Sequence, residues 1–476
     1  MVTQHGEYSI PDEHRVHKPG AWLPADHRIH QEYLRRVITH VDETPQQLLP
    51  VIEEFQQLIE TTPRIYMYFV QMFDEASRRK PYVRESNVAA RMRDHHHMLQ
   101  VLNHILSQAP QWSDAEAGVG MIGVPMCAVF DYEMGTPSGH AAFLDPDVNR
   151  MMKKLLNEWG KYLQVSKLRL TFRARGNSEV ADCIVDPRLP NRLPCWAMIG
   201  WVGSGRRAWP ILWRSRTRRT SRRSSLRKCT SAIRLRNTTA SSLGMVGFTE
   251  SHADFFTRRV HDSARPVAHP NDDSVIANAC ESTTFHAQHG VKLRDEFFNK
   301  GQPYSVLDML AHDPLASAFE GGTVYQAFLS ALSYHRWHAP VSGTVRRAFV
   351  QEGTYFSVLL SEEVGEPDVS ETGVEGAQGY LSAMATRGII VIEADNADIG
   401  LVAFIAIGME EVSTCEITVR EGQHVVKGDE TGMFHFGGST YCMLFQKGVE
   451  LEGLPEVAGR VNVPVRSQLG VVKKKK

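Results

Sequence analysis

A stretch of 63 residues without any acidic side chain divides this chain into two parts. Between Asp186 and Glu250 there are fourteen basic residues, although Lys+Arg (53) and Asp+Glu (54) nearly balance over all 476 residues. The other 413 residues therefore carry 39 basic and 54 acidic side chains, a net charge of −15. Such a stretch does not fit a packed domain of mixed charge, so we expect the folded parts on either side of it.

This basic segment is open to three interpretations. Its centre, residues 214–242, is rich in Arg, Ser and Thr, has almost no aromatic residues and shows no clear period. It is a disordered linker, an arm that binds nucleic acid or another acidic surface, or a translation artefact such as a frameshift or retained intron. Isolated tryptophans among Arg/Ser/Thr runs (Trp201, Trp209 and Trp213) are typical of a gene read in the wrong frame. The artefact requires that another frame of the same codons yields acid-bearing amphipathic sequence.

Composition also bears on the compartment. Seven cysteines are few and odd in number, and no CxxC pair occurs, so a reduced cytoplasmic setting fits better than a disulfide framework or a zinc site. Residues 1–20 lack the apolar core of a signal peptide, and the apolar run at 400–409 is about half the length that crosses a bilayer. We therefore expect no transmembrane anchor and no nucleic-acid partner. Lys473–Lys476 is expected to be a solvated tail, with a membrane or nucleic-acid role as the alternative.

Apolar periodicity changes along the chain. From about residue 24 to 163, apolar residues recur at steps of three and four, which predicts helices at 48–60, 64–76, 98–108 and 147–163. Later, short β-branched and aromatic runs at 388–395, 399–408, 415–422 and 440–448 predict strands joined by tight turns. We expect an α+β chain with an all-α N-terminal domain (1–165), the basic linker (166–247) and an antiparallel β-rich domain (248–476).

Two short motifs carry the candidate chemistry. In 432-GMFHFGGST-440, Gly437 and Gly438 precede Ser439, so no Cβ shields the Gly438 carbonyl from attack. In 334-YHRWHAPVSGTV-345, His335 and His338 stand three residues apart. Each motif alone is weak, because most GGS triplets are turns and most HxxH pairs are structural. Together they are specific.

With several further blocks, these motifs resemble the phosphatidylserine decarboxylase family of pyruvoyl enzymes, and within it the soluble fungal tryptophan decarboxylases. The similarity is strong from Phe248 to about Lys447, and it extends to the helical region but not to residues 166–246. This gap agrees with the artefact interpretation. The quoted blocks are 254-DFFTRRVHDSARP-266, 353-GTYF-356, 391-VIEADNADIG-400, 408-GMEEVSTCE-416, 421-EGQHVVKGDE-430, 49-LPVIEEFQQLIE-60, 72-MFDE-75 and 158-EWGKYL-163.

The resemblance implies a proenzyme that cuts itself between Gly438 and Ser439. Ser439 attacks the Gly438 carbonyl with His338 as the base, and elimination and hydrolysis leave a covalent pyruvoyl cofactor at position 439. A substrate amine then forms a Schiff base with it and loses CO₂. His335 is the candidate proton donor, with a structural histidine as the alternative. The products are residues 1–438 and 439–476.

One departure from the family concerns the residue that orients His338. Where the family commonly has Ala-Asp-Gly, this chain reads 278-NACES-282, so Cys280 replaces the aspartate and Glu281 lies beside it. Glu281 is the candidate replacement. The alternative is an exposed Glu281, with His338 oriented by a backbone carbonyl.

The substrate and the remaining alternatives stay open. An aromatic amino acid, L-tryptophan first, needs only a closed pocket, whereas phosphatidylserine needs a route onto the bilayer. Lys427 lies in a turn similar to those of lipoyl and biotin carriers, so a non-catalytic carrier is an alternative, as is an inactive homologue. Family members are often homodimers. No metal is expected, because His95, His96 and His97 are consecutive and predict a polar helix surface.

Overall fold

The computed structural model describes residues 27–78, 91–108, 124–164, 171–174, 181–184, 245–246, 256–295, 304–329, 333–358, 377–412, 414–435, 439–456 and 462–474. Most of the basic linker (166–247), which includes the greater part of the acid-free segment, lies outside these residues. Within it, only the short strands β1 (Thr171–Ala174), β2 (Ala181–Ile184) and β3 (Met245–Val246) are described. The three interpretations of that segment therefore stay open.

The N-terminal part of the described chain is helical, as predicted. Five of its helices begin with proline, whose fixed φ suits the first helical position and whose missing N–H would be unpaired there anyway. The apolar stripes face one another: α2 buries Ile52, Phe55 and Ile59, and α8 buries Trp159. The helices are α1 (His27–Glu43), α2 (Pro50–Thr61), α3 (Pro63–Ser77), α4 (His95–Leu106), α6 (Pro125–Met134), α7 (Pro137–Leu144) and α8 (Pro146–Gln164).

The C-terminal part is built around an eight-stranded antiparallel sheet in the order β13-β9-β10-β11-β15-β7-β6-β17. Two three-stranded sheets, β12-β14-β8 and β16-β18-β5, accompany it, and β4 (Arg259–Val260) pairs with β3. The other strands are β5 (Val275–Ala277), β6 (Ser282–His289), β7 (Thr323–Leu329), β8 (Arg336–His338), β9 (Gly343–Gln351), β10 (Arg387–Ala394), β11 (Leu401–Gly408), β12 (Thr414–Ile417), β13 (His424–Val425), β14 (Glu430–His435), β15 (Ser439–Phe445), β16 (Leu451–Glu452), β17 (Asn462–Val463) and β18 (Gln468–Val472).

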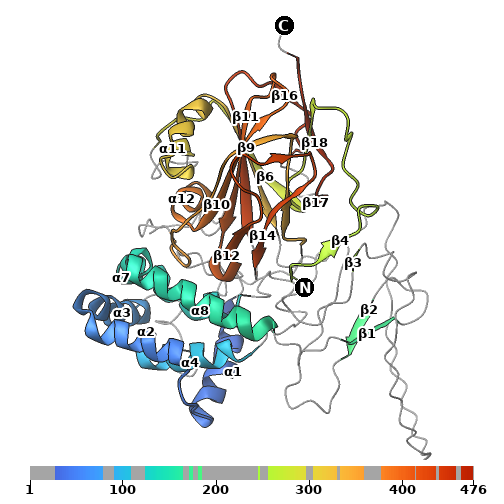
Figure 1. Ribbon diagram of the computed structural model, residues 1–476. Helices are drawn as coiled ribbons and strands as arrows, with labels where there is room; N and C mark the ends of the chain where they lie inside the picture. Colours follow the sequence, from blue (N-terminus) through green and yellow to red (C-terminus); the bar gives the residue numbers. More distant parts are fainter. Residues whose placement is uncertain are drawn as a thin grey trace, which may run out of the picture.

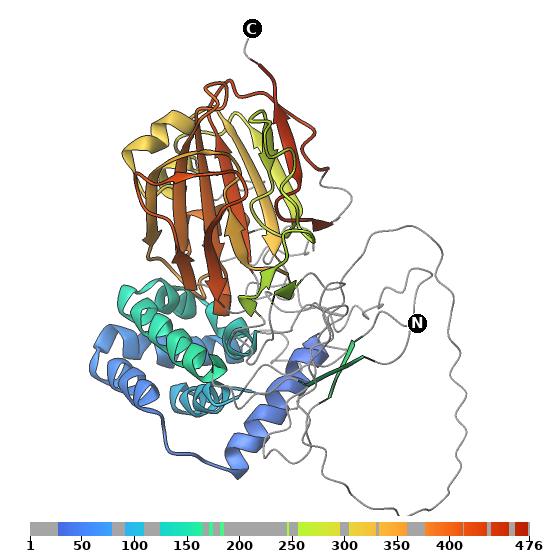
Figure 2. The same ribbon diagram turned by 45° about the vertical axis from the view of Figure 1, so that its right-hand side comes forward.

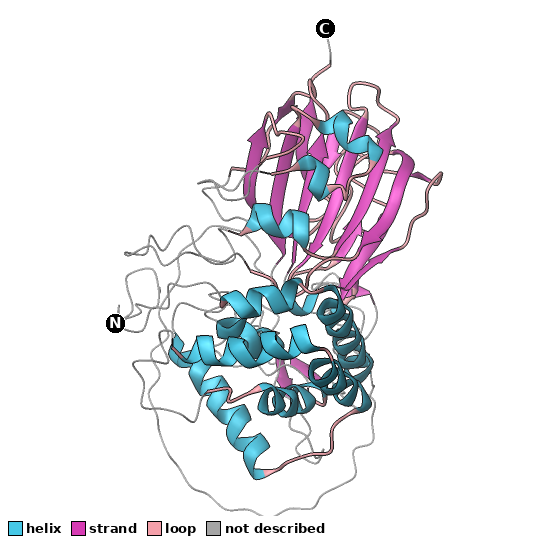
Figure 3. Cartoon of the chain, turned by 90° about the vertical axis from the view of Figure 1, so that its left-hand side faces the viewer, coloured by secondary structure: helices cyan, strands magenta, loops and turns pink. Residues whose placement is uncertain are grey.

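Both faces of the large sheet are covered, and β15 shows how. All seven of its residues are buried, and those from Tyr441 to Phe445 alternate between two apolar cores. Tyr441 and Met443 pack toward Trp337 of the β12-β14-β8 sheet, while Cys442 and Leu444 pack with residues of α11 (Val306–Met309) and η4 (Pro314–Phe319). Figure 3 shows these short helices and α12 (Gln378–Met384) over one face of the sheet. The predicted α+β architecture is confirmed.

Trp337 requires a close backbone approach from the strand beside it. A Cβ on Gly432 of β14 would come within 2.4 Å of the indole, and Phe434 on the same strand meets the ring edge-on at 4.8 Å. Only glycine at position 432 leaves room for this packing. It ties β8, which carries one of the predicted histidines, to β14, which leads toward Ser439.

The helical domain lies against one end of the large sheet (Figures 1 and 2). The segment after β9 enters its core, where Phe356 packs 4.9 Å from Phe130 and 6.2 Å from Phe143, measured between ring centroids. Glu411, in η5 (Glu410–Val412) just after β11, accepts hydrogen bonds from the first amides of α6. The two domains are therefore joined by both apolar and polar contacts. In the described part of the chain, the helices are too short or too polar to span a membrane.

Phe356→Ala should test this docking. Phe356 is fully buried, so its removal leaves a cavity between the domains and should lower the free energy of unfolding by about 3–5 kcal/mol. Val70→Ala on α3 is the control, because Val70 is 44% exposed and should change it by less than about 0.5 kcal/mol. Urea denaturation followed by fluorescence measures both. Equal midpoints for the two variants would contradict the described docking.

Candidate active site

Ser439 is the first residue of β15 and lies at the end of the sheet that faces the helical domain. Its backbone is in register with Gly408, the last residue of β11, and with Leu329, the last residue of β7. The side chain is 1% exposed, and its Oγ is buried without a hydrogen-bond partner among the described residues. Gly438, the other half of the predicted cleavage bond, lies outside the described residues. A buried hydroxyl left unpaired is costly, and such atoms are concentrated where chemistry takes place.

His338 ends β8 and is fixed on both edges of its ring. Nε2 lies 2.9 Å from the hydroxyl of Tyr334, while Nδ1 lies 2.8 Å from the Gly428 carbonyl and 3.1 Å from Nε of Arg466. The two contacts at Nδ1 belong to different tautomers, because a protonated Nδ1 donates to Gly428 and an unprotonated one accepts from Arg466. In either tautomer, His338 has little freedom to rotate.

The surroundings of His338 favour its neutral form. Burial, and then the charge of Arg466, lower the pKa of His338 to about 4, although the Gly428 carbonyl and Asp262 act in the opposite direction. The neighbouring Tyr334 stays protonated, because burial raises its pKa to about 12. A neutral imidazole can accept a proton, so His338 meets the first requirement of a general base.

His335 lies just before β8, and its ring is fully buried. It stacks on Phe256 with ring centroids 3.9 Å apart, and its carbonyl accepts a hydrogen bond from the amide of Phe434 at 3.0 Å. Phe434 belongs to β14, which is separated from Ser439 only by residues 436–438. His335 is therefore hydrogen-bonded to the strand that leads into the predicted cleavage bond.

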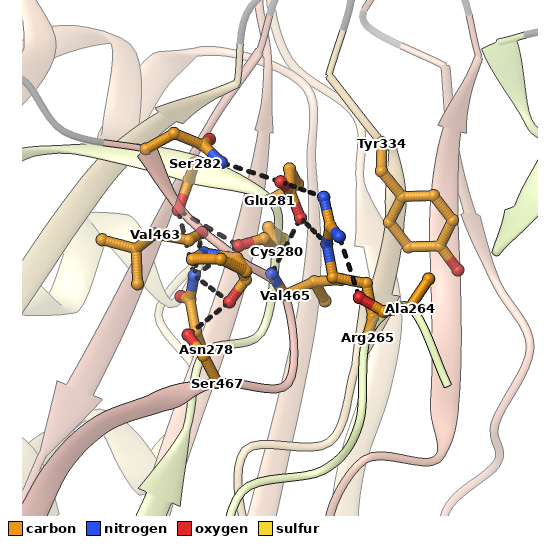
Figure 4. Close-up of polar contacts among 12 residues, drawn as sticks. Ala264, Arg265, Asn278, Cys280, Glu281, Ser282, Tyr334, Val463, Val465 and Ser467 are labelled. Atoms are coloured by element: carbon orange, nitrogen blue, oxygen red, sulfur yellow. Dashed lines mark hydrogen bonds and ion pairs between the residues drawn. The ribbon is translucent and has the colours of Figure 1, made fainter. Parts of the chain in front are cut away.

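Glu281 lies just before β6 and is 7% exposed (Figure 4). Its oxygens accept hydrogen bonds from Nε and Nη2 of Arg265 at 2.8 and 2.9 Å, from Nδ2 of Asn462 at 2.7 Å and from the amide of Val465 at 3.0 Å. Burial alone would raise the pKa of Glu281, but Arg265 and the other donors bring it below its usual value. We call Glu281, Arg265, Asn462 and Val465 the Glu281 anchor.

The structure brings Glu281 and His338 into the same region but gives them different partners. The described contacts of Glu281 are those of the Glu281 anchor, and a backbone carbonyl faces Nδ1 of His338, as in the alternative considered above. That alternative also expected Glu281 to be exposed, whereas the structure buries it. Cys280, at the position of the family aspartate, is fully buried, and burial raises the pKa of its thiol, so it stays protonated.

Arg466 and Asp262 are site residues that the sequence analysis did not find. Nη1 of Arg466 donates to Asp262 at 2.6 Å, while its Nε faces His338. Asp262 lies in 254-DFFTRRVHDSARP-266, one of the blocks that carry the family resemblance, and that block could have indicated it. Arg466 lies in no motif, and its place beside His338 depends on the pairing of β17 and β18 with β6 and β5.

The structure contradicts one alternative and one expectation from the sequence. Lys427 is only 4% exposed, and its Nζ donates to the carbonyls of His269, Asp272 and Val275, so it cannot serve as the exposed lysine of a carrier domain. His95 and His97 are buried at 5% and 6% exposure, because they face the helical core, whereas His96 is exposed as expected.

One cluster in the helical domain has ligand-type atoms close enough to share a metal ion. Among the described residues it comprises Glu60, His95 and His96, whose ligand atoms lie within 4.8 Å of one another. His96 and Glu60 are exposed, and the cluster belongs to α2 and α4 rather than to the decarboxylase domain. Ser439, His338 and His335 are not part of it.

Comparison with known proteins agrees with this architecture. Two phosphatidylserine decarboxylase family profiles match residues 49–175 and 252–464. The decarboxylase iboD of Amanita muscaria is 38% identical over 350 residues, covering 68% of this chain and 84% of the relative. The L-tryptophan decarboxylases of Psilocybe cyanescens and Psilocybe cubensis are 32% and 31% identical, and each match covers 90% of this chain and 88% or 89% of the relative.

The chain belongs to the phosphatidylserine decarboxylase family, and it is a decarboxylase, a carboxy-lyase. The predicted resemblance to the fungal subgroup is confirmed. Phosphatidylserine decarboxylase proenzymes match a smaller part: the proenzyme 3 of Schizosaccharomyces pombe is 28% identical over 43% of this chain. The L-tryptophan decarboxylases therefore match more of this chain than this phosphatidylserine decarboxylase proenzyme does.

Glu281→Gln should destabilise the decarboxylase domain. It leaves Arg265 without its buried carboxylate, which should cost about 3–5 kcal/mol of unfolding free energy. Glu393→Gln is the matched control: Glu393 pairs with Arg346 where both side chains are about half exposed, so its loss should cost less than about 1 kcal/mol. Urea denaturation in a Ser439→Ala background keeps both chains uncut. Equal losses would contradict the anchoring role.

Proposed function

We propose that this protein is a pyruvoyl-dependent decarboxylase that cuts itself between Gly438 and Ser439 and acts on an aromatic amino acid, L-tryptophan first. The observation that carries the proposal is Ser439 itself. Its hydroxyl is buried and unpaired among the described residues, at the start of a central strand and directly after two glycines. A serine in this position has a reactive atom ready and no structural hydrogen bond to break.

The proposed self-cleavage needs a base and a leaving group. His338 takes the proton of Ser439 as Oγ attacks the Gly438 carbonyl and passes it to the departing amino group of residue 439, so an ester replaces the Gly438–Ser439 amide bond. The neutral state of His338 and its fixed ring support this role. The hydrogen bond between the Tyr334 hydroxyl and Nε2 of His338 holds the imidazole ring in its orientation.

The residues present fit a covalent pyruvoyl group at position 439. β15 continues beyond this position with both of its edges paired, so the residue stays at the sheet end after the chain is cut. When formed, the group supplies an electron sink for decarboxylation. His335, buried and stacked on Phe256, is the proposed proton donor on the neighbouring chain segment, and Glu281 supports the site through the Glu281 anchor.

Two features support an amino-acid substrate over a phospholipid. The relatives whose matches cover 90% of this chain, and therefore both domains, are named as L-tryptophan decarboxylases. In this structure, the helical domain packs against the sheet end that carries Ser439 (Figure 2). That domain would hold a bilayer surface away from Ser439, whereas a free amino acid can diffuse to the site from solvent.

The substrate can be tested directly with the purified, cut protein. L-Tryptophan should give tryptamine and CO₂, and phosphatidylserine vesicles should give neither CO₂ nor phosphatidylethanolamine. The uncut Ser439→Ala chain is the control and should release no CO₂ from either, because it lacks the atom from which the cofactor forms. Lipid decarboxylation without tryptamine would reverse the substrate assignment, and CO₂ release by Ser439→Ala would contradict the pyruvoyl mechanism.

A further inference from the structure

Arg466 reaches His338 from the far end of the sequence. Its guanidinium lies between the imidazole, 3.1 Å from Nδ1, and the Asp262 carboxylate, 2.6 Å from Oδ1. Arg466 belongs to the 38 residues after the proposed cleavage bond, whereas His338 and Asp262 precede it. The smaller product of self-cleavage would therefore contribute a side chain to the base of the larger one.

The backbone of Arg466 holds this side chain in place. Its φ is 65°, in the left-handed region that non-glycine residues seldom adopt. Both backbone groups are bound, since the amide donates to the Asn278 carbonyl at 2.8 Å and the carbonyl accepts from Ala268 at 2.9 Å. Uncommon conformations persist when several contacts fix them, and they are concentrated at functional sites.

The Glu281 anchor fixes the segment that carries Arg466. Figure 4 shows Glu281 between Arg265 and Val465, which is the residue directly before Arg466. Asn462, four residues before Arg466, donates to the same carboxylate. Glu281 thus fixes the position of Arg466 through two hydrogen bonds to the 462–466 segment, one from Asn462 and one from Val465.

We propose that Arg466, held by Asp262 and by the Glu281 anchor, is the positioning residue of His338 in self-cleavage, in place of the aspartate that this chain lacks at position 280. This inference rests on the proposed function, because it assigns Arg466 to the same reaction. Glu281 acts on His338 indirectly, through Arg466.

A cation has the opposite electrostatic effect from an aspartate. Among the described residues, the charged and titratable groups that face His338 are Tyr334, Arg336, Asp262 and Arg466. After burial, Arg466 contributes most to the low pKa of His338, and Asp262 opposes it. Removing Arg466 should therefore raise the pKa of His338, and removing Asp262 should lower it. Since the base must be neutral, a higher pKa moves the acid limit of cleavage to higher pH.

Self-cleavage of the full chain, followed from pH 4 to 8 after cell-free synthesis, tests the proposal. The unsubstituted chain should cleave at a constant rate down to about pH 5. Arg466→Gln should cleave at least about tenfold more slowly on the plateau, with its acid midpoint moved up toward the ordinary histidine value of about 6.5. Arg466→Lys keeps the charge but not the planar fork, so its plateau should fall while its midpoint stays low. Asp262→Asn should not move the midpoint up.

Matched variants separate positioning from general destabilisation. Arg346→Gln removes a half-exposed arginine of β9 and should leave both rate and midpoint unchanged. Glu281→Gln should slow cleavage, and adding it to Arg466→Gln should slow it no further, because both act through the same contact. Arg466→Gln and Arg466→Lys with the plateau and midpoint of the unsubstituted chain would overturn the inference. Absence of cleavage in the unsubstituted chain would instead contradict the proposed function.

Discussion

The hydrogen bonding of β15 along both edges is the interaction on which the rest of the structure depends. All residues of β15 from Ser439 to Phe445 pair with β7 on one edge and with β11 on the other. The alternating side chains of β15 enter the apolar cores on both faces of the sheet. The proposed cut at the beginning of this strand would therefore remove one covalent bond and leave the pairing and packing intact. The β17–β6 and β18–β5 pairs hold the remainder of the C-terminal piece in the same way.

The helical domain completes the sheet end at which β15 begins. Gly408 is the neighbour of Ser439, and Glu411 follows three residues later with an oxygen bound to the amides of Met126 and Cys127. Burial raises the pKa of Glu411 to about 8, and the two amides at the start of α6 act against that rise. Together with Phe356, this contact joins the helical domain to the sheet end that carries Ser439. Under the proposed function, the docked helical domain therefore lies beside the site of the reaction.

Local sequence patterns predicted the elements well and their long-range partners poorly. The helices around residues 50–61 and 146–164 and the strands around 387–394 and 401–408 follow from apolar periodicity, and the GGS and HxxH motifs pointed to Ser439, His335 and His338. The partner of Glu281 did not follow, because Asn462 and Val465 lie more than 180 residues away and arrive through sheet pairing. For the same reason, no motif indicated Arg466. His95 and His97 were misjudged because burial depends on the neighbouring helices, not on three consecutive letters.

The central claim is that residue 439 becomes the modified first residue of a separate C-terminal piece. Intact mass spectrometry of the purified protein tests it most directly. The account predicts two polypeptides, the smaller beginning at position 439 and lighter, by the loss of ammonia, than a fragment with an ordinary N-terminal serine. A single uncut chain, or a small fragment with a free serine amine, would contradict it.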